Sequence, residues 1–169
     1  MIRRFRRFVH DRRGVAAVEF ALWSVLILGA LVPCLDFANY LLQSDRLNGA
    51  VRQASILAYN MRGGAVDTRQ LSQYVAASAG SGLAVSATVS CNGNQQSCAT
   101  PPSDRACACV GPGKPVTFVP TGVCGATCAG GATSGFYLTV AGTRPYRTIV
   151  PNRWLNGQII EGTTTVRLQ

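Results

Sequence analysis

The stretch RRGVAAVEFALWSVLILGALVPCL, residues 12–35, holds two arginines, a glycine and then an apolar run in which Glu19 is the only acid or base. As a helix, the residues from Val15 to Leu35 would span about 30 Å, the thickness of a bilayer's hydrocarbon core. We therefore predict a membrane-spanning helix over residues 15–38. A carboxylate in that region costs about 2 to 4 kcal/mol, so Glu19 is expected to reach the inner headgroups, to be protonated or to meet a cation.

The flank before this helix is strongly basic. Residues 1–14 hold six arginines against one acid, Asp11, and such blocks stay on the cytoplasmic side during insertion. We expect residues 1–14 to be a cytoplasmic leader and the remainder to be exported. Of the net charge of +9, residues 15–169 keep ten basic and six acidic residues, a net of +4, scattered singly. No nucleic acid is expected as a partner, because binding it needs a basic patch with interleaved aromatics.

The string from Arg13 to Phe20 carries a resemblance to a known family. Gly14, Glu19 five places later and the aromatic Phe20 look like the class III signal of type IV pilins and pseudopilins, in the tight-adherence (Flp-type) branch. Residues 44–54, SDRLNGAVRQA, are similar to the extension of the first helix in TadE-like pilus-assembly proteins. The resemblance implies a bacterial inner-membrane protein with one pass, an N-terminus in the cytoplasm and a periplasmic head that can enter an extracellular pilus.

The same resemblance implies roles for four residues. A prepilin peptidase would cut between Gly14 and Val15, where glycine lets an extended backbone lie close to the catalytic carboxylates. Glu19 and Phe20 would then serve assembly, with Glu19 meeting the new amine of a neighbouring subunit as half of an ion pair. Its expected partners are other pilins or pseudopilins through the N-terminal helix, the inner-membrane pilus assembly machinery and the lipid bilayer.

These roles describe a minor pseudopilin that helps to initiate, cap or assemble the fibre. Major pilins of this branch are far shorter, with little after the first helix. The alternative is an uncleaved, membrane-anchored periplasmic module whose disulfide-stabilised loop binds a partner or an envelope glycan. An ordinary secretory signal and a lipoprotein signal fit less well, because Pro33 directly precedes Cys34.

Beyond the membrane the helical period continues as an exported segment, residues 39–62. Apolar and small residues recur at three- and four-residue steps, and paired glycines, Gly63 and Gly64, follow. The stripe comprises Tyr40, Ser44, Leu47, Val51, Ala54 and Ala58. A shorter helix with Asp67 as N-cap and Leu71, Tyr74, Val75 and Ser78 on one side should then end at Gly80.

The period next changes to two, which predicts strands. Three segments qualify: Leu83 to Val89, Phe136 to Val140, and Ile159 to Leu168. We expect one antiparallel sheet with its apolar face against the long helix. The fold class is therefore α+β and pilin-like, with residues 63–169 forming the head. Trp154 and Leu155 are expected to plug one end of the core, and Tyr146 to lie at an edge or turn.

Six of the seven cysteines lie in residues 91–134, a segment with neither period: Cys91, Cys98, Cys107, Cys109, Cys124 and Cys128. An oxidising compartment would pair them. Excluding a bridge between Cys107 and Cys109 leaves 12 of the 15 possible pairings open.

A metal site is the competing use of these cysteines. Only Cys124 and Cys128 have the spacing of a zinc knuckle, and the sole histidine, His10, lies in the leader. No catalytic residue, metal or cofactor is predicted, because the exported part offers neither a histidine nor an acid pair. The glycine motif from Gly111 to Lys114 indicates a turn, and Cys34 is expected to be a free thiol.

Overall fold

The computed structural model describes residues 14–80, 84–113, 115–149 and 156–169. The predicted leader up to Arg13, Leu83 of the first predicted strand, and the predicted plug Trp154 and Leu155 lie outside these ranges. The chain divides into two compact units, one ending at Asn39 and one running from Tyr40 to Gln169. The long helix α2 (Val15–Asn60) contributes to both units.

The bounds of α2 agree with the prediction of a helix that starts at Val15 and is closed by the glycine pair. The helix continues through Pro33 and ends at Asn60. The amide of Gly64 then donates to the carbonyl of Met61 at 3.1 Å in the turn that follows. Within the second unit the predicted stripe is confirmed, because Leu47, Val51, Ala54 and Ala58 are all buried.

The second helix, α3 (Thr68–Ser78), begins as predicted at Asp67. The Asp67 carboxylate accepts hydrogen bonds from the amides of Arg69 at 2.9 Å and Gln70 at 3.0 Å. Leu71 and Val75 are buried. The prediction that Ser78 lies on this buried face was wrong. Ala79 lies four residues after Val75 and is fully buried, whereas Ser78 is exposed.

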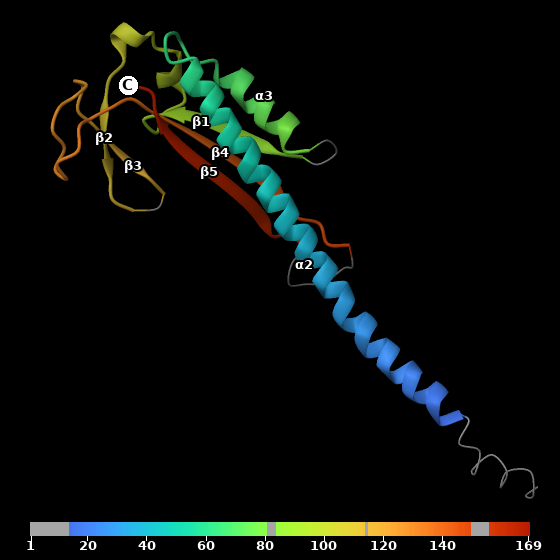
Figure 1. Cartoon of the computed structure of the whole chain (residues 1–169). Coiled ribbons are helices and arrows are strands. Elements are labelled where there is room, and N and C mark those ends of the chain that lie inside the picture. Colours follow the sequence, from blue (N-terminus) through green and yellow to red (C-terminus); the bar gives the residue numbers. More distant parts are fainter. Residues whose placement is uncertain (1–13, 81–83, 114, 150–155) are drawn as a thin grey trace, which may run out of the picture. The chain divides into compact units, whose positions relative to one another are not determined.

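One antiparallel sheet is formed by β1 (Ser86–Cys91), β4 (Tyr137–Pro145) and β5 (Ile159–Arg167), in the order β1-β4-β5 (Figure 1). This is the predicted three-stranded sheet. Its register pairs Val89 with Val140, and Val140 with Thr164. Val89, Leu138 and Val140 are buried, so the alternation in the sequence marks the side of the sheet that faces the core.

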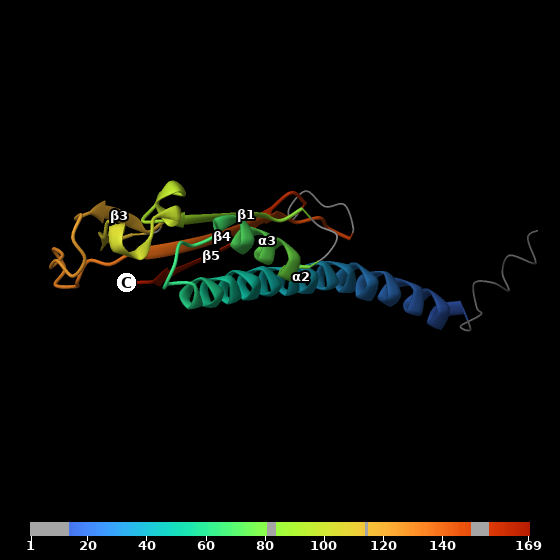
Figure 2. The ribbon, with the colours of Figure 1, turned by 90° about the horizontal axis from the view of Figure 1, so that it is seen from above.

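The core lies between this sheet and the two helices (Figure 2). A pair of glycines facing each other across β4 and β5, Gly142 and Gly162, permits the close packing. A Cβ at Gly142 would lie 3.0 Å from Leu47 and 3.2 Å from Val51, both on α2. A Cβ at Gly162 would lie 2.8 Å from the side chain of Asn48. The predicted contact between the sheet and the long helix is therefore confirmed.

Tyr146 belongs to this core, and its prediction as an edge or turn residue was wrong. The side chain is fully buried and meets Tyr40 edge to face, with ring centroids 5.3 Å apart. The backbone explains the placement, because the Tyr146 amide donates to the carbonyl of Gln158 at 2.8 Å. This bond extends the β4–β5 pairing past Pro145, so Tyr146 keeps the orientation of a strand residue.

The cysteine-rich segment has more regular structure than its sequence indicates. It contains two 3-10 turns, η2 (Gln96–Ala99) and η3 (Pro102–Asp104), and a hairpin of β2 (Ala108–Gly111) and β3 (Thr117–Pro120). Strands of four residues are too short to show a period of two. The turn predicted from Gly111 onwards does connect them.

Candidate functional site

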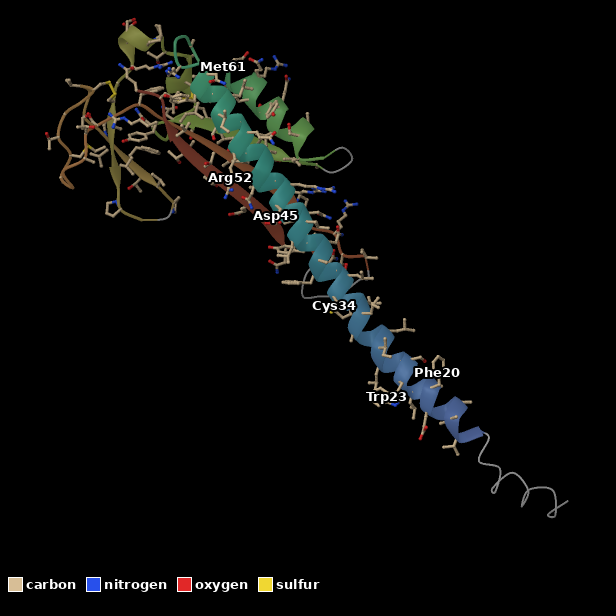
Figure 3. The ribbon with its side chains drawn as sticks, in the orientation of Figure 1. Phe20, Trp23, Cys34, Asp45, Arg52 and Met61 are labelled. Carbon is tan, nitrogen blue, oxygen red and sulfur yellow. A yellow bond between two sulfur atoms is a disulfide. The ribbon has the colours of Figure 1, made fainter. Side chains whose placement is uncertain are left out.

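The first half of α2 presents an exposed apolar surface. Phe20 is 76% exposed, Val25 69% and Trp23 64%, and Figure 3 shows the Phe20 and Trp23 side chains projecting away from the helix. Within α2, an 18-residue window with a mean hydropathy of 2.3 has none of its residues buried. Among the described residues, α2 is the one helix long and apolar enough to cross a bilayer. It is compatible with a single-pass membrane anchor.

The four residues with predicted roles in cleavage and assembly lie at the start of this surface. Gly14 immediately precedes α2, Val15 is its first residue, and Glu19 and Phe20 lie on its next turn. All four are exposed. In the described part of the chain Glu19 has no ion-pair partner, so its carboxylate stands among apolar side chains.

Packing against the described residues does not require glycine at position 14. A Cβ built there would meet nothing within 4 Å, and the φ of Gly14 is not in the left-handed region. The residue therefore has neither of the two common structural reasons for a glycine, a close contact or a positive φ.

At the far end of the second unit, three disulfides organise the cysteine-rich segment. They join Cys91 to Cys98, Cys107 to Cys124 and Cys109 to Cys128, with Cα–Cα distances of 5.1, 4.9 and 5.7 Å. The three predicted bridges are thus present, and the pairing that the sequence left open is resolved. Six sulfurs held in disulfides are not thiolates that could ligate zinc. Cys34 is free and exposed.

Arg105 connects this bridged segment to the end of α2, a role that sequence reasoning missed. Its guanidinium donates to the carbonyl oxygens of Arg62 at 3.0 Å and Gly64 at 2.6 Å, and lies over the ring of Phe136 at 4.8 Å. The side chain is 5% exposed, and this burial lowers the pKa of Arg105. A lone arginine in a polar loop gives no sequence signal of such burial.

A second buried arginine, Arg144 on β4, fixes the end of α3. Its guanidinium donates to the carbonyl of Ala79 at 3.4 Å. Desolvation, followed by the nearby positive charge of Arg46, lowers the pKa of Arg144. Both buried arginines therefore bind carbonyl oxygens at helix ends, where a cation is favoured.

A pocket of about 250 Å³ lies beside the disulfides, lined among others by Asn92, Asp104 and Phe136. The Asn92 side chain is already engaged on both sides: its amide donates to the carbonyl of Ala106 at 2.7 Å, and its oxygen accepts from the amide of Tyr137 at 2.9 Å. Among the described residues there is no group of three histidine, cysteine, aspartate or glutamate side chains that could hold a metal. These contacts make Asn92 a structural residue that ties the segment to β4.

Part of the chain matches a family of known proteins. Residues 14–55, about a quarter of the 169 residues, match the family of TadE-like proteins. No curated protein and no solved structure matches the chain. The matched segment begins at Gly14 and covers most of α2, so it includes Val15, Glu19 and Phe20. Over residues 14–55 the protein is therefore TadE-like, which confirms the resemblance seen in the sequence and associates the chain with the tight-adherence pilus system.

Proposed function

We propose that the chain is a minor pseudopilin of a tight-adherence pilus machine. It is stored in the bacterial inner membrane with its N-terminus in the cytoplasm and its head in the periplasm. A prepilin peptidase removes residues 1–14, and the subunit then takes part in initiating, capping or assembling the fibre. The observation that carries the proposal is the exposed Glu19, which lies in an apolar helix four residues after the proposed new N-terminus.

The energetics of Glu19 support an assembly role. A lone carboxylate facing lipid costs about 2 to 4 kcal/mol, and the described part of the chain supplies no cation to it. Cleavage after Gly14 would create an amine at Val15, a positive charge at the same end of the helix. When two subunits associate, the Val15 amine of one can pair with the Glu19 carboxylate of the other, so association removes the cost of the unpaired charge.

The environment of Gly14 supports cleavage at this position. Since the described residues leave room for a side chain there, packing does not account for the glycine, and a peptidase that binds an extended backbone would give a reason for it. The three disulfides support export, because such bridges form and persist in oxidising compartments such as the periplasm. The bridged segment would be the surface that distinguishes this subunit from a bulk pilin.

A pair of glycine variants tests cleavage. In cells that carry the peptidase, the unaltered chain should run as the shorter form on an electrophoretic gel, and Gly14→Leu should accumulate at the uncleaved size. Gly29→Leu is the matched control, because a Cβ at Gly29 also meets nothing within 4 Å; it should be processed normally. If the Gly14→Leu protein is shortened as efficiently as the control, cleavage after Gly14 is refuted.

The assembly role is tested separately by Glu19→Ala. The variant should be inserted and processed normally, yet lower fibre production measured by electron microscopy and by sheared surface protein. Glu19→Asp keeps the charge and should retain part of the fibre yield. If Glu19→Ala cells make fibres at the normal level, the ion-pair mechanism is wrong. An uncleaved chain together with unchanged fibres would instead favour an anchored periplasmic binding module.

A further inference from the structure

The exported half of α2 carries a second ordered surface on the side opposite the core. Six residues on this side follow steps of three and four, and we call them the seam: Leu42, Asp45, Gly49, Arg52, Ile56 and Tyr59. Their apolar members are well exposed, with Leu42 at 58%, Ile56 at 63% and Tyr59 at 44%. The opposite side of the same helix holds Leu47, Val51 and Ala54 in the core. The seam therefore faces away from the core of the head, and its apolar side chains are exposed.

Alternating steps of three and four are the spacing by which one helix packs along another in a coiled coil. In the seam, two charges and a glycine lie between apolar side chains: Leu42 precedes them, and Ile56 and Tyr59 follow. Asp45 and Arg52 are seven residues apart, so they lie on the same side of α2, as Figure 3 shows. Both side chains are exposed, and neither has an ion-pair partner within the described part of the chain.

The order of residues in the seam selects one alignment of two parallel copies. In register, Asp45 would face Asp45 and Arg52 would face Arg52, which is repulsive. A shift of one heptad, about 10.5 Å along the helix, brings Asp45 of one copy beside Arg52 of the other. The same shift places Ile56 opposite Gly49, where a neighbouring side chain has room.

We propose that the seam binds the seam of a second copy of this chain, in parallel and displaced by one heptad. The inference rests on the proposed function in one respect: anchoring both copies in the same membrane makes them parallel, and fibre assembly supplies the displacement along the axis. An antiparallel pair would also bring Asp45 beside Arg52, but two membrane-anchored copies cannot adopt it.

Counting along α2, the displacement has the same direction as the proposed pairing at the N-terminus. When one copy supplies Glu19 to the Val15 amine of the other, it lies four residues closer to the cytoplasm than that other copy. When one copy supplies Arg52 to Asp45 of the other, it lies seven residues closer to the cytoplasm than that other copy. The difference of three residues is about 4.5 Å, which the long glutamate and arginine side chains can span. The seam would thus set the stagger at a second point along the helix.

Cysteine cross-linking of full-length protein in fibre-producing cells tests the alignment. Two differently tagged chains are expressed together, one carrying Gly49→Cys and the other Ile56→Cys, both with Cys34→Ser, so that Asp45 and Arg52 stay in place. After mild oxidation, the expected product is a heterodimer on a non-reducing gel. Each variant expressed alone should give no dimer, because equal positions do not face each other. Arg46→Cys with Gln53→Cys is the matched control: both residues are exposed and have the same spacing, but they lie to the side of the seam, so this pair should stay monomeric.

Charge reversal supplies the second measurement. The same cysteines are used for this step, because the displacement brings Gly49 and Ile56 opposite each other. Asp45→Arg in both chains should abolish the heterodimer, and adding Arg52→Asp should restore it. Strong homodimers of Gly49→Cys alone would overturn the displaced alignment, and a heterodimer no stronger than the control pair would overturn the seam. Leader removal is read on the same gels, so a failure of the proposed function appears there as an uncleaved chain, independently of the cross-link.

Discussion

The disulfide between Cys107 and Cys124 should make a large covalent contribution to the stability of the head. Its sequence separation is 17 residues, but with the Cys109–Cys128 bridge intact the loop it closes is much smaller and is worth about 2.5 kcal/mol in the chain-entropy model. Cys107 is also fully buried, so a serine there would bring a hydroxyl into the core. Replacing both cysteines by serine should therefore cost at least about 2.5 kcal/mol, a large part of the 5 to 15 kcal/mol typical of a domain.

Removing the bridge between Cys109 and Cys128 gives a second loss of stability to compare with the first. Its separation is 19 residues, but the Cys107–Cys124 bridge already joins the two segments. The loop left to close then has three residues on one side and five on the other, worth about 2.5 kcal/mol, the same as for Cys107–Cys124. Both of its cysteines are half-buried, so serine substitution adds little desolvation. The Cys109→Ser/Cys128→Ser variant should therefore be less destabilised than Cys107→Ser/Cys124→Ser.

Pulse proteolysis across a urea series measures these differences on the full chain in detergent. The fraction of head that survives a brief protease exposure reports the folded population at each concentration, and the midpoint gives the change in free energy of unfolding. Cys34→Ser is the control and should leave the midpoint unchanged, since that thiol is free and exposed. A Cys107→Ser/Cys124→Ser protein that keeps the midpoint of the unaltered chain would refute the reasoning.

Three further predictions concern the packing of the head. Gly142→Val should lower the free energy of unfolding by about 1 to 3 kcal/mol, because the added atoms collide with Leu47 and Val51; an unchanged urea midpoint would contradict the close packing of α2 on the sheet. Arg105→Met should leave two carbonyl oxygens unpaired at a cost of about 1 to 3 kcal/mol, and faster tryptic cleavage after Arg62 would report the loosened turn. Asp67→Ala should cost about 1 kcal/mol through the lost helix cap, whereas Asp67→Asn should cost less; equal midpoints for all three residues would exclude the capping role.

Features that depend on neighbours along the chain could be predicted from the sequence. The apolar run and the three- and four-residue steps of α2 specify the helix and its buried side, and Asp67 marks the start of α3 through its own local hydrogen bonds. The alternation in β1, β4 and β5 specifies which side of each strand is buried. The candidate cleavage and assembly residues are also local, because their spacing from Gly14 to Phe20 is the signal.

Features that depend on distant neighbours could not be predicted. Tyr146 is buried because Tyr40, on another element, covers it. Arg105 is buried because two carbonyls at the exit of α2 accept its hydrogen bonds. The disulfide pairing needs the β2–β3 hairpin, whose strands are too short to be recognised, to bring Cys107 and Cys109 within reach of Cys124 and Cys128.

The mature N-terminus of protein isolated from its native envelope tests the central claim most directly. Intact mass spectrometry with N-terminal sequencing distinguishes the two possible chains without any substitution. The account predicts a chain that begins at Val15, with the new amine placed to meet a neighbouring Glu19. A chain that still begins at Met1 would contradict it and would leave a permanently anchored periplasmic head.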